Sequence, residues 1–316
     1  MVDNLVFKDM QVPDLSVILV SWNTCTELRE CLTSVYAADP GRMEVIVIDN
    51  ASGDDSVHMV QREFPDVKLL VNPGNYGFGR GVNQGLEIYS GRYALLLNPD
   101  SVVSPGAFTD LIKFADANPD SGIIGMKILN SDGTLQYSCR RFPTLEAAIF
   151  RNTILTRFFP KNTYTLEYLM TNWDHTSPTD VDWVSGAAML LRRKFVEDVG
   201  VLDERFFMYC EDVDMGYRAK QKGWRVTYFP GAVVTHARGK SSDKSPNRMI
   251  VEHHKSMYKF YKKHYFGNSS LIARMLVPGM VVARAGFFVM RNEYYRARRA
   301  LDAFRNSPTG GGGNHG

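Results

Sequence analysis

Four short apolar segments, each followed by a stretch with helical periodicity, constrain the fold of this chain most strongly. They are residues 15–20, 44–49, 67–71 and 92–97, all rich in Val, Ile and Leu. Runs of this length and composition are typical of strands buried on both faces. Their alternation with helices predicts an α/β fold, with a mostly parallel, doubly wound sheet and helices on both faces.

The connecting segments carry signals for helix starts. Thr24 and Glu27 have the spacing of a capping box, in which a hydroxyl and an acidic side chain cap each other's backbone. Ser104 is followed by a proline, which favours an N-cap with proline at the first helical position. A glycine-rich stretch, residues 74–85, leads into a further helix.

The second half of the chain has a different rhythm. Residues 130–133, Asn-Ser-Asp-Gly, predict a hairpin turn. Residues 143–178 are rich in aromatic and polar side chains, and we interpret them as an acceptor-side flap. Beyond them we expect one buried strand over 182–191, a helix over 211–222 and a strand within 224–235.

Composition excludes few classes of protein. The chain has 316 residues, 44% of them hydrophobic and 22% charged, which suits a globular protein with a real core. A net charge of +3 gives no reason to expect nucleic-acid binding. Residues 1–13 lack the apolar core of a signal peptide. The cysteines show no metal-type spacing, so we expect a reduced, cytoplasmic protein; they are Cys25, Cys31, Cys139 and Cys210.

The C-terminal region mixes apolar side chains with arginines. Residues 269–305 contain no run near the roughly 20 apolar residues of a spanning helix, since Arg274, Pro278 and Arg284 interrupt them. Arginines recur every seven residues and predict a basic stripe on a helix lying on an anionic membrane surface. The alternative is a helix packed on the protein body with its arginines in water. The stripe comprises Arg284, Arg291, Arg298 and Arg305, and the Gly-rich residues 307–316 are predicted to be disordered.

Carboxylates follow two of the predicted strands. Asp49 ends the second strand, and Asn98-Pro99-Asp100 follows the fourth. A carboxylate at the end of a buried parallel strand lies at the rim of the sheet, where ligands bind. Asp49 could accept hydrogen bonds from a nucleobase or ribose, or it could cap the next helix together with Ser52. Asp100 offers an oxygen ligand for Mg²⁺ or Mn²⁺ on a nucleotide diphosphate, or it could belong to a turn.

The glycine-rich stretch could bind phosphates. Glycines permit close backbone approach, a helix start favours negative charge, and Arg80 could reach a phosphate. The stretch is neither a Walker loop nor a dinucleotide-binding fingerprint, because it follows the third strand and lacks the Gly-Lys-Ser/Thr ending.

A second acidic motif, Glu211-Asp212, starts a predicted helix. One of its carboxylates could act as a general base, although acidic residues also favour helix starts for electrostatic reasons. His236 follows an apolar strand and could bind a metal through a neutral ring nitrogen, or it could be structural.

In this order, the motifs resemble the inverting glycosyltransferases of family 2, which have the GT-A fold, over roughly residues 13–265. The Gly-Asn-x-Gly-Phe wording of the glycine-rich loop is similar to the rhamnosyltransferase-like branch of that family. One departure is Asn98, which stands where the family has the first aspartate of Asp-x-Asp. The matching segments are residues 16–23, 49–54, 74–85, 98–100, 181–187 and 206–214.

The resemblance implies roles for individual residues. Asp212 would deprotonate the acceptor hydroxyl, and Asp100 with His236 would hold Mg²⁺ or Mn²⁺. The acceptor would lie against Asp182, Trp183 and Glu211, although Trp183 could equally be a core residue. The nucleotide donor would contact Ser21, Asp49, Asp54, Asn75, Gly77, Arg80, Asn98 and Asp100.

The resemblance also implies a reaction and a place for it. The expected donor is dTDP-rhamnose, with UDP- and GDP-sugars as alternatives. The expected acceptor is a glycan or a polyprenyl-diphosphate-linked saccharide of cell-surface polysaccharide synthesis. The enzyme would be cytoplasmic and peripheral on the inner face of the cell membrane. The expected parts are a GT-A domain (1–267, with donor half 13–120 and acceptor half 121–267), a basic helical extension (268–306) and the tail.

Three other classes compete with this reading. A sugar-nucleotide nucleotidyltransferase would want a Gly-rich basic loop after the first strand, where Ser21-Trp22-Asn23-Thr24 stands. A catalytically inactive carbohydrate-binding homologue would have no reason to keep Asp100, Asp212 and His236 together. A processive synthase would need spanning helices and a Gln-x-x-Arg-Trp run, and we expect neither.

Overall fold

The computed structural model describes residues 12–38, 41–144, 147, 158–159, 162–237 and 246–305. Contacts divide the chain into two compact units. The first comprises residues up to Phe207 together with Glu211–Ser241, and the second comprises Met208–Cys210 together with the chain from Ser242 onward. The helix that precedes residue 267 groups with the C-terminal helix in the second unit. The domain boundary after 267 stays a prediction.

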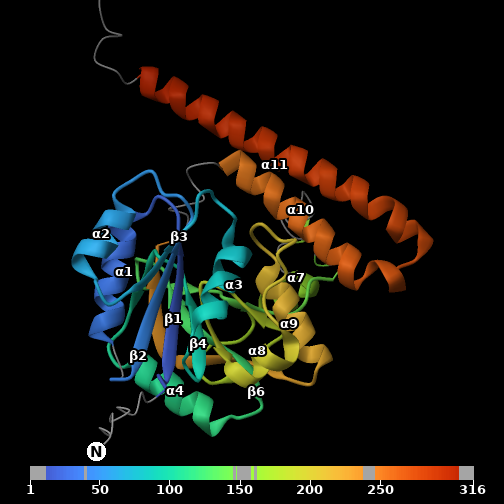
Figure 1. The fold of residues 1–316 in the computed structure, drawn as a ribbon. Helices are drawn as coiled ribbons and strands as arrows, with labels where there is room; N and C mark the ends of the chain where they lie inside the picture. The colour runs from blue at the N-terminus through green and yellow to red at the C-terminus, as the bar shows by residue number, and fades with distance from the viewer. Residues whose placement is uncertain are drawn as a thin grey trace, which may run out of the picture. The chain divides into compact units, whose positions relative to one another are not determined.

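A ten-stranded sheet forms the centre of the first unit (Figure 1). Its order is β3-β2-β1-β4-β11-β6-β12-β5, with β7 paired to β6 and β9 to β12, and a separate pair joins β8 and β10. The strands are β1 (Leu15–Ser21), β2 (Met43–Asp49), β3 (Lys68–Val71), β4 (Tyr93–Leu97), β5 (Ser101–Val103), β6 (Ser121–Leu129), β7 (Leu135–Gln136), β8 (Cys139–Arg140), β9 (Thr179–Asp180), β10 (Trp183–Val184), β11 (Ala188–Arg192) and β12 (Arg225–His236).

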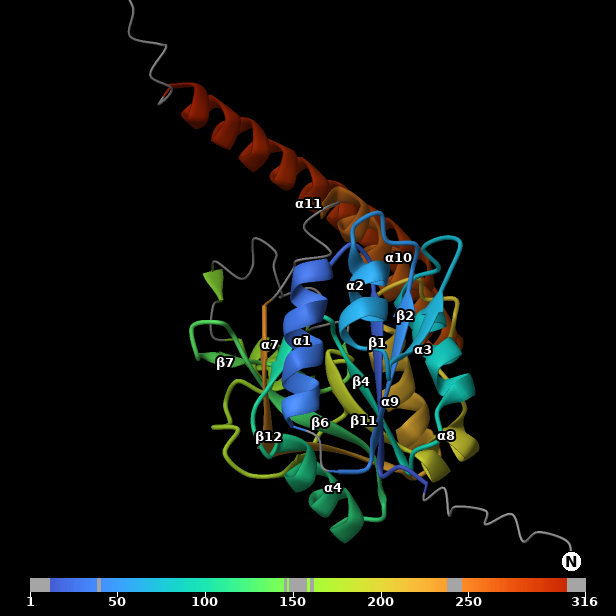
Figure 2. The same cartoon turned by 60° about the vertical axis from the view of Figure 1, so that its left-hand side comes forward.

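Helices cover both faces of this sheet, as predicted (Figure 2). Alternate residues of β1 point to opposite faces: Val17 and Leu19 pack with α1, α2 and α4, whereas Ile18 and Val20 pack with α3, α8 and α9. The helices are α1 (Cys25–Ala37), α2 (Ser56–Glu63), α3 (Phe78–Ile88), α4 (Ala107–Ala117), α7 (Thr163–Leu169), α8 (Arg193–Val199) and α9 (Glu211–Gln221).

The sheet is parallel in its first half and mixed in its second. The strands β1 to β4 pair in parallel, and β11 then runs antiparallel to both β4 and β6. The single strand predicted over 182–191 is two strands, β10 and β11, separated by residues 185–187. The break occurs because the amide of Ser185 donates to the carbonyl of Ser138, which takes β10 into the small sheet with β8.

Two predicted helix caps differ in detail. Thr24 is the N-cap of α1, but its hydroxyl pairs with that of Ser21, 3.1 Å away, and no capping box forms. Asp54 accepts the hydrogen bond from the Cys25 amide instead, at 3.0 Å. Helix α4 begins at Ala107 after Gly106, so the Ser104-Pro105 pair forms the preceding turn. The predicted hairpin is confirmed, since residues 130–133 join β6 to β7.

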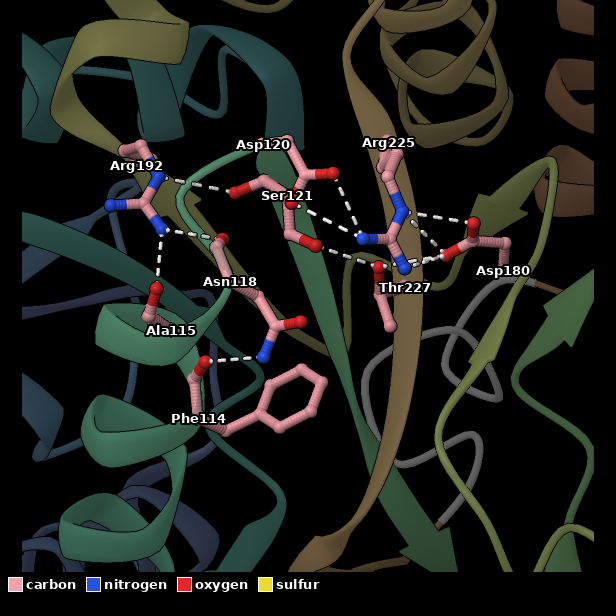
Figure 3. A network of polar contacts seen from close by, with 9 residues as sticks. All are labelled: Phe114, Ala115, Asn118, Asp120, Ser121, Asp180, Arg192, Arg225 and Thr227. Carbon is pink, nitrogen blue, oxygen red and sulfur yellow. Dashed lines mark hydrogen bonds and ion pairs between the residues drawn. The ribbon is translucent and has the colours of Figure 1, made fainter.

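Charged side chains hold together the beginnings of β6 and β12, near Ser121 and Arg225 (Figure 3). The Arg225 guanidinium pairs with Asp120 and Asp180, both at 2.9 Å. Arg192 donates to the carbonyl oxygens of Ala115 and Asn118, where α4 ends. Because Arg225 begins β12 and His236 ends it, this network stabilises the opposite end of the same strand.

The second unit contains α10 (Pro246–His264), a short 3₁₀ helix η2 (Phe266–Asn268) and α11 (Leu271–Arg305). The helices α10 and α11 pack together, in part through His254 and Phe288. Helix α11 continues through Pro278 rather than stopping there. Within its segment Leu271–Arg299, a window of 18 residues has a mean hydropathy of 1.6 and is only 6% buried, so by length and composition the segment could cross a membrane. The expectation that no such stretch exists was wrong.

Two predicted regions lie wholly or partly outside the described residues. The predicted disordered tail, 307–316, is one of them. Of the predicted flap, 143–178, the described part includes α7 and the residues between α7 and β9.

Candidate active site

The carboxyl ends of three parallel strands bring predicted donor residues to one edge of the sheet. Ser21 and Asp49 are register partners at the ends of β1 and β2. On the other side of β1, Leu19 pairs with Leu97, so Asn98 and Asp100 follow at the same edge. This is the position at which open α/β sheets bind ligands.

Asp49 and Asp54 also make local hydrogen bonds. Asp49 is buried, and its two carboxylate oxygens accept from the amide and the hydroxyl of Ser52, at 2.8 and 2.6 Å. Asp54 is exposed and accepts from the amides of Cys25 and Ser56, at 3.0 and 3.1 Å. These contacts order the loops after β1 and β2, and the nucleotide contacts of both residues stay predictions.

Asp100 and His236 lie directly against each other. The Asp100 Oδ1 atom is 3.0 Å from His236 Nε2, and the side-chain nitrogen of Asn98, Nδ2, is 3.2 Å from the same ring atom. Pairing of β5 with β12 places them there, since His236 is the register partner of Ser101. The Ala237 amide also donates to the Asp100 carbonyl oxygen at 3.0 Å.

A carboxylate oxygen beside an imidazole nitrogen is a donor pair that suits Mg²⁺ or Mn²⁺. The side chains of Asp100 and His236 are only 9% and 10% exposed, so they are held in place before any ion arrives. In the part of the chain that the structure describes, no group of three or more His, Cys, Asp or Glu side chains comes together. Asp100 and His236 are therefore a pair of side chains that could hold a metal ion.

Asp212 is connected to this pair through two consecutive backbone residues. Its Oδ2 atom accepts from the Gly186 amide at 3.2 Å, and its Oδ1 atom accepts from the Val213 amide at 2.8 Å. The carbonyl of Ala187, the next residue, accepts from the Asn98 amide at 2.9 Å. The break between β10 and β11 therefore joins the predicted base to the predicted metal site.

Burial raises the pKa of both acidic groups at the start of α9. For Asp212, desolvation outweighs the hydrogen bonds from the Gly186 and Val213 amides, so its pKa lies above the usual aspartate value. For Glu211, desolvation and then the charge of Asp212 raise the pKa well above the usual value. One Glu211 oxygen is buried without a hydrogen-bond partner, which fits a neutral acid. Asp212 accepts from two amides, which favours its charged form, so it is the candidate proton acceptor of the pair.

The glycine-rich loop is fixed by backbone contacts. Gly77 has φ 87° and ψ 176°, a conformation open almost only to glycine, and a Cβ atom there would lie 2.2 Å from the Phe207 carbonyl oxygen. The Asn75 side chain accepts from the Gly77 amide at 3.0 Å. Arg80 is exposed, and its guanidinium lies 4.3 Å from the centre of the Tyr76 ring. Arg80 is therefore free of the core and could contact a phosphate.

Four amide side chains that hold this loop escaped the sequence analysis. Asn50 donates to the Gly77 carbonyl oxygen at 3.1 Å, and Asn72 bridges Asn50 and Gln84. Asn83 exchanges hydrogen bonds with the backbone of Leu202, at 2.9 and 3.0 Å. Asn50 and Asn72 directly follow β2 and β3, so polar residues at adjacent strand ends were the available signal.

The predicted acceptor residues Asp182 and Trp183 are buried. Asp182 accepts from the Phe142 amide at 2.7 Å and pairs with Lys220 and Arg141. The Trp183 indole donates to the Arg141 carbonyl oxygen at 2.9 Å and is 8% exposed. These contacts favour core packing for Trp183, and an acceptor role for either residue stays a prediction.

Comparison with known proteins identifies the family. A family model described as "Glycosyltransferase like family 2" matches residues 13–252. The chain belongs to glycosyltransferase family 2.

Curated relatives extend this assignment. The chain is 31% identical over 296 residues to an N-acetylglucosaminyl-diphospho-decaprenol L-rhamnosyltransferase of Mycobacterium tuberculosis, covering 90% of this chain and 95% of that protein. It is 27% identical to the rhamnosyltransferase WbbL of Escherichia coli K12, over 70% of this chain and 82% of WbbL. The rhamnosyltransferase-like branch of family 2, expected from the glycine-rich loop, is thereby confirmed.

Solved structures support the GT-A fold. GalNAc-T7, crystallised with UDP, GalNAc and Mn²⁺, superposes with a TM-score of 0.55 at 16% identity over 73% of this chain. Staphylococcus aureus TarS superposes with a TM-score of 0.51 at 18% identity over 78% of this chain. The chain spans less than half of each of these structures, 44% and 40%, so the likeness concerns the fold.

Proposed function

We propose that this family 2 glycosyltransferase inverts the configuration of the sugar it transfers, and that it moves rhamnose from dTDP-rhamnose to a saccharide hydroxyl. The acceptor we propose is a glycan carried on a polyprenyl diphosphate, in cell-surface polysaccharide synthesis. Support for the sugar and the acceptor comes from the relatives, two of which are named rhamnosyltransferases, one of them for a diphospho-decaprenol substrate.

The observation that carries the proposed mechanism is the short backbone path between Asp212 and the Asp100–His236 pair, through Gly186, Ala187 and Asn98. One ionisable base lies near one pair of candidate metal ligands. Asp212 accepts the proton of the acceptor hydroxyl, and the hydroxyl oxygen attacks the anomeric carbon from the face opposite the leaving nucleotide diphosphate. A single displacement of this kind inverts the configuration.

The charge that develops on the leaving diphosphate needs compensation. Asp100 and His236 would hold Mg²⁺ or Mn²⁺, which supplies positive charge at the leaving group when bound. Arg80, in the first turn of α3, would contribute a further positive charge. Asn98 in place of a carboxylate removes one negative charge from this edge of the sheet, so the diphosphate meets less repulsion.

We also propose a peripheral position on the inner face of the cell membrane. Helix α11 exposes large apolar side chains together with arginines, the composition of a helix that binds an anionic lipid surface. The exposed apolar residues include Leu271, Ile272, Met275, Leu276, Val282, Phe287 and Met290.

A panel of nucleotide sugars tests the proposed function. Thermal unfolding is measured with dTDP-rhamnose, UDP-sugars and GDP-sugars, each with and without Mn²⁺. Transfer of the sugar to a polyprenyl-diphosphate-linked saccharide is then measured by mass spectrometry. We expect stabilisation by dTDP-rhamnose with Mn²⁺ and a product of inverted anomeric configuration by NMR. Product formation only from a nucleoside triphosphate and a sugar phosphate would instead show a nucleotidyltransferase. A retained configuration would contradict the single displacement.

A further inference from the structure

A chain of hydrogen bonds runs from the β6–β7 hairpin to His236. Gln136 on β7 is 6% exposed, and its Oε1 atom lies 2.9 Å from His236 Nδ1. Its amide nitrogen donates to Asn130 Oδ1 at 3.0 Å and to the His236 carbonyl oxygen at 3.4 Å. Gln136 therefore contacts His236 on the ring side away from Asp100.

The carboxylate of Asp132, in the hairpin turn, determines which groups donate and which accept in this series of hydrogen bonds. Asp132 accepts from both the amide and the hydroxyl of Thr134, at 3.0 and 2.6 Å, and these bonds hold the pKa of Asp132 below its usual value. The single Thr134 hydroxyl proton is thus used, so Thr134 Oγ1 accepts from the Asn130 amide nitrogen at 2.9 Å. Asn130 must then present its oxygen to Gln136.

Neither side-chain amide in this series of hydrogen bonds, Gln136 or Asn130, can be turned over without losing hydrogen bonds. Turning Gln136 over would bring its oxygen against Asn130 Oδ1 and the His236 carbonyl oxygen, which are both acceptors. Turning Asn130 over would bring its oxygen against the Thr134 hydroxyl, whose proton is already donated to Asp132. Only one orientation of each amide satisfies every partner, and it leaves Gln136 Oε1 as an acceptor facing His236 Nδ1.

This orientation selects one tautomer of His236. A ring nitrogen that faces an acceptor carries a proton, so Nδ1 is protonated, and whenever the ring is neutral the lone pair is therefore on Nε2. The Asn98 amide nitrogen, 3.2 Å from Nε2, can donate to that lone pair. Asp100 Oδ1 lies 3.0 Å from the same Nε2 atom, so the space between them takes either a proton on Nε2 or a cation bound to both atoms.

We propose that Gln136 is a positioning residue that holds His236 in the Nδ1–H tautomer, so that Nε2 is available to a divalent cation beside Asp100. The inference rests on the proposed function in one respect, the use of Asp100 and His236 as metal ligands. Outer partners of this kind fix the tautomer and the orientation of metal-binding histidines. The hairpin thereby serves the candidate metal site.

The tautomer can be measured on the whole protein without donor or metal. The ring nitrogens are labelled with ¹⁵N, and the His236 signals are assigned from their loss in His236→Gln. We expect the neutral ring to carry its proton at Nδ1 and to leave Nε2 unprotonated. A neutral ring that carries its proton at Nε2 would overturn the proposal.

Substitution of Gln136 then tests the cause. Gln136→Leu removes the acceptor at similar size, and we expect loss of the fixed tautomer and about a 10–100-fold weaker affinity for Mn²⁺. The affinity is read from paramagnetic broadening of the histidine signals during titration with Mn²⁺ alone. Gln136→Glu keeps an acceptor oxygen for Nδ1 and should keep the tautomer. Ser131→Ala, in the same turn but outside the hydrogen-bond chain, should change neither.

The readouts separate failure of this inference from failure of the proposed function. An unchanged tautomer and an unchanged Mn²⁺ affinity in Gln136→Leu would overturn the positioning role. If the wild-type ring shows the expected tautomer but Mn²⁺ does not broaden its signals, the tautomer assignment stands and the proposed metal site falls. The choice of sugar donor affects none of these measurements.

Discussion

At the residue scale, the reactivity of the candidate site depends on which of two adjacent carboxyl groups ionises. Replacing Asp212 with Asn keeps its shape and removes the proton acceptor. We expect transfer to fall about 10²–10⁴-fold while stabilisation by the nucleotide sugar persists. Steady-state rates and thermal shifts check both parts. Near-normal turnover in this variant would rule out Asp212 as the base.

The neighbouring Glu211 leads to a prediction about stability and pH. Its folded-state pKa is raised, so burial of its ionised form costs free energy of folding at any pH above the unfolded pKa near 4.5. Glu211→Gln removes this cost. We expect the free energy of unfolding to rise by about 1–2 kcal/mol at pH 7, and the gain to disappear as the pH falls toward 4.

Urea unfolding over a pH series measures this difference. The exposed Glu87→Gln variant is the matched control, because it removes a carboxylate from the surface of α3 and should give no comparable gain. A Glu211→Gln variant that is less stable than the wild type at pH 7 would mean that the glutamate is ionised and satisfied in the folded protein.

At the scale of elements, the loop before α3 depends on one glycine. Gly77→Ala would place a methyl group against the Phe207 carbonyl oxygen and force an alanine into a backbone region that belongs to glycine. We expect a loss of about 2–4 kcal/mol in unfolding free energy, together with weaker donor binding. Gly74→Ala is the control, since its added Cβ would meet only the Tyr76 ring at 3.8 Å. Equal stability of the two variants would show that the loop shifts without cost.

Local patterns were sufficient to predict the elements that local forces determine. The apolar runs 15–20 and 92–97 form buried strands, and Asn130–Gly133 forms its turn, because burial and turn chemistry are properties of neighbouring residues. The motif order likewise identified the family. Where distant partners compete, the prediction failed: Ser138 breaks the strand expected over 182–191.

The same distinction holds in the candidate site. Asp100 and His236 could be proposed from their places at strand ends, and the structure brings them into contact. The role of Gln136 could not be found in this way, because it depends on His236, which is 100 residues away in the sequence. Helix α11 shows a third reason: Pro278 reads as an interruption, yet a helix can continue through a proline at the loss of a hydrogen bond.

At the scale of the whole molecule, the basic stripe of α11 predicts how the protein binds lipid. A combined Arg291→Gln and Arg298→Gln variant removes two exposed charges, each worth about 1 kcal/mol at an anionic surface. We expect roughly 30-fold weaker binding to anionic vesicles, and little change with neutral vesicles. Arg62→Gln, exposed on α2, is the control. Vesicle flotation at low and high salt measures the effect.

Removal of residues 268–316 should abolish vesicle binding altogether. Unchanged binding by the truncated protein would exclude α11 as the membrane contact. Resistance of the intact protein to extraction by high salt and alkaline carbonate would indicate that α11 crosses the bilayer, which its hydropathy permits.

The position of β11 between β4 and β6 has a consequence for biosynthesis. The ribosome releases β1 to β4 first, and those four strands can pair in parallel at once. The far edge of β4, a fully buried strand in the finished enzyme, must then wait until β11 emerges from residue 188 onward. During this interval the nascent chain displays an unpaired apolar edge, which is prone to join the edge of another chain. The late arrival of one five-residue strand thus sets the period in which the nascent chain is most prone to aggregate.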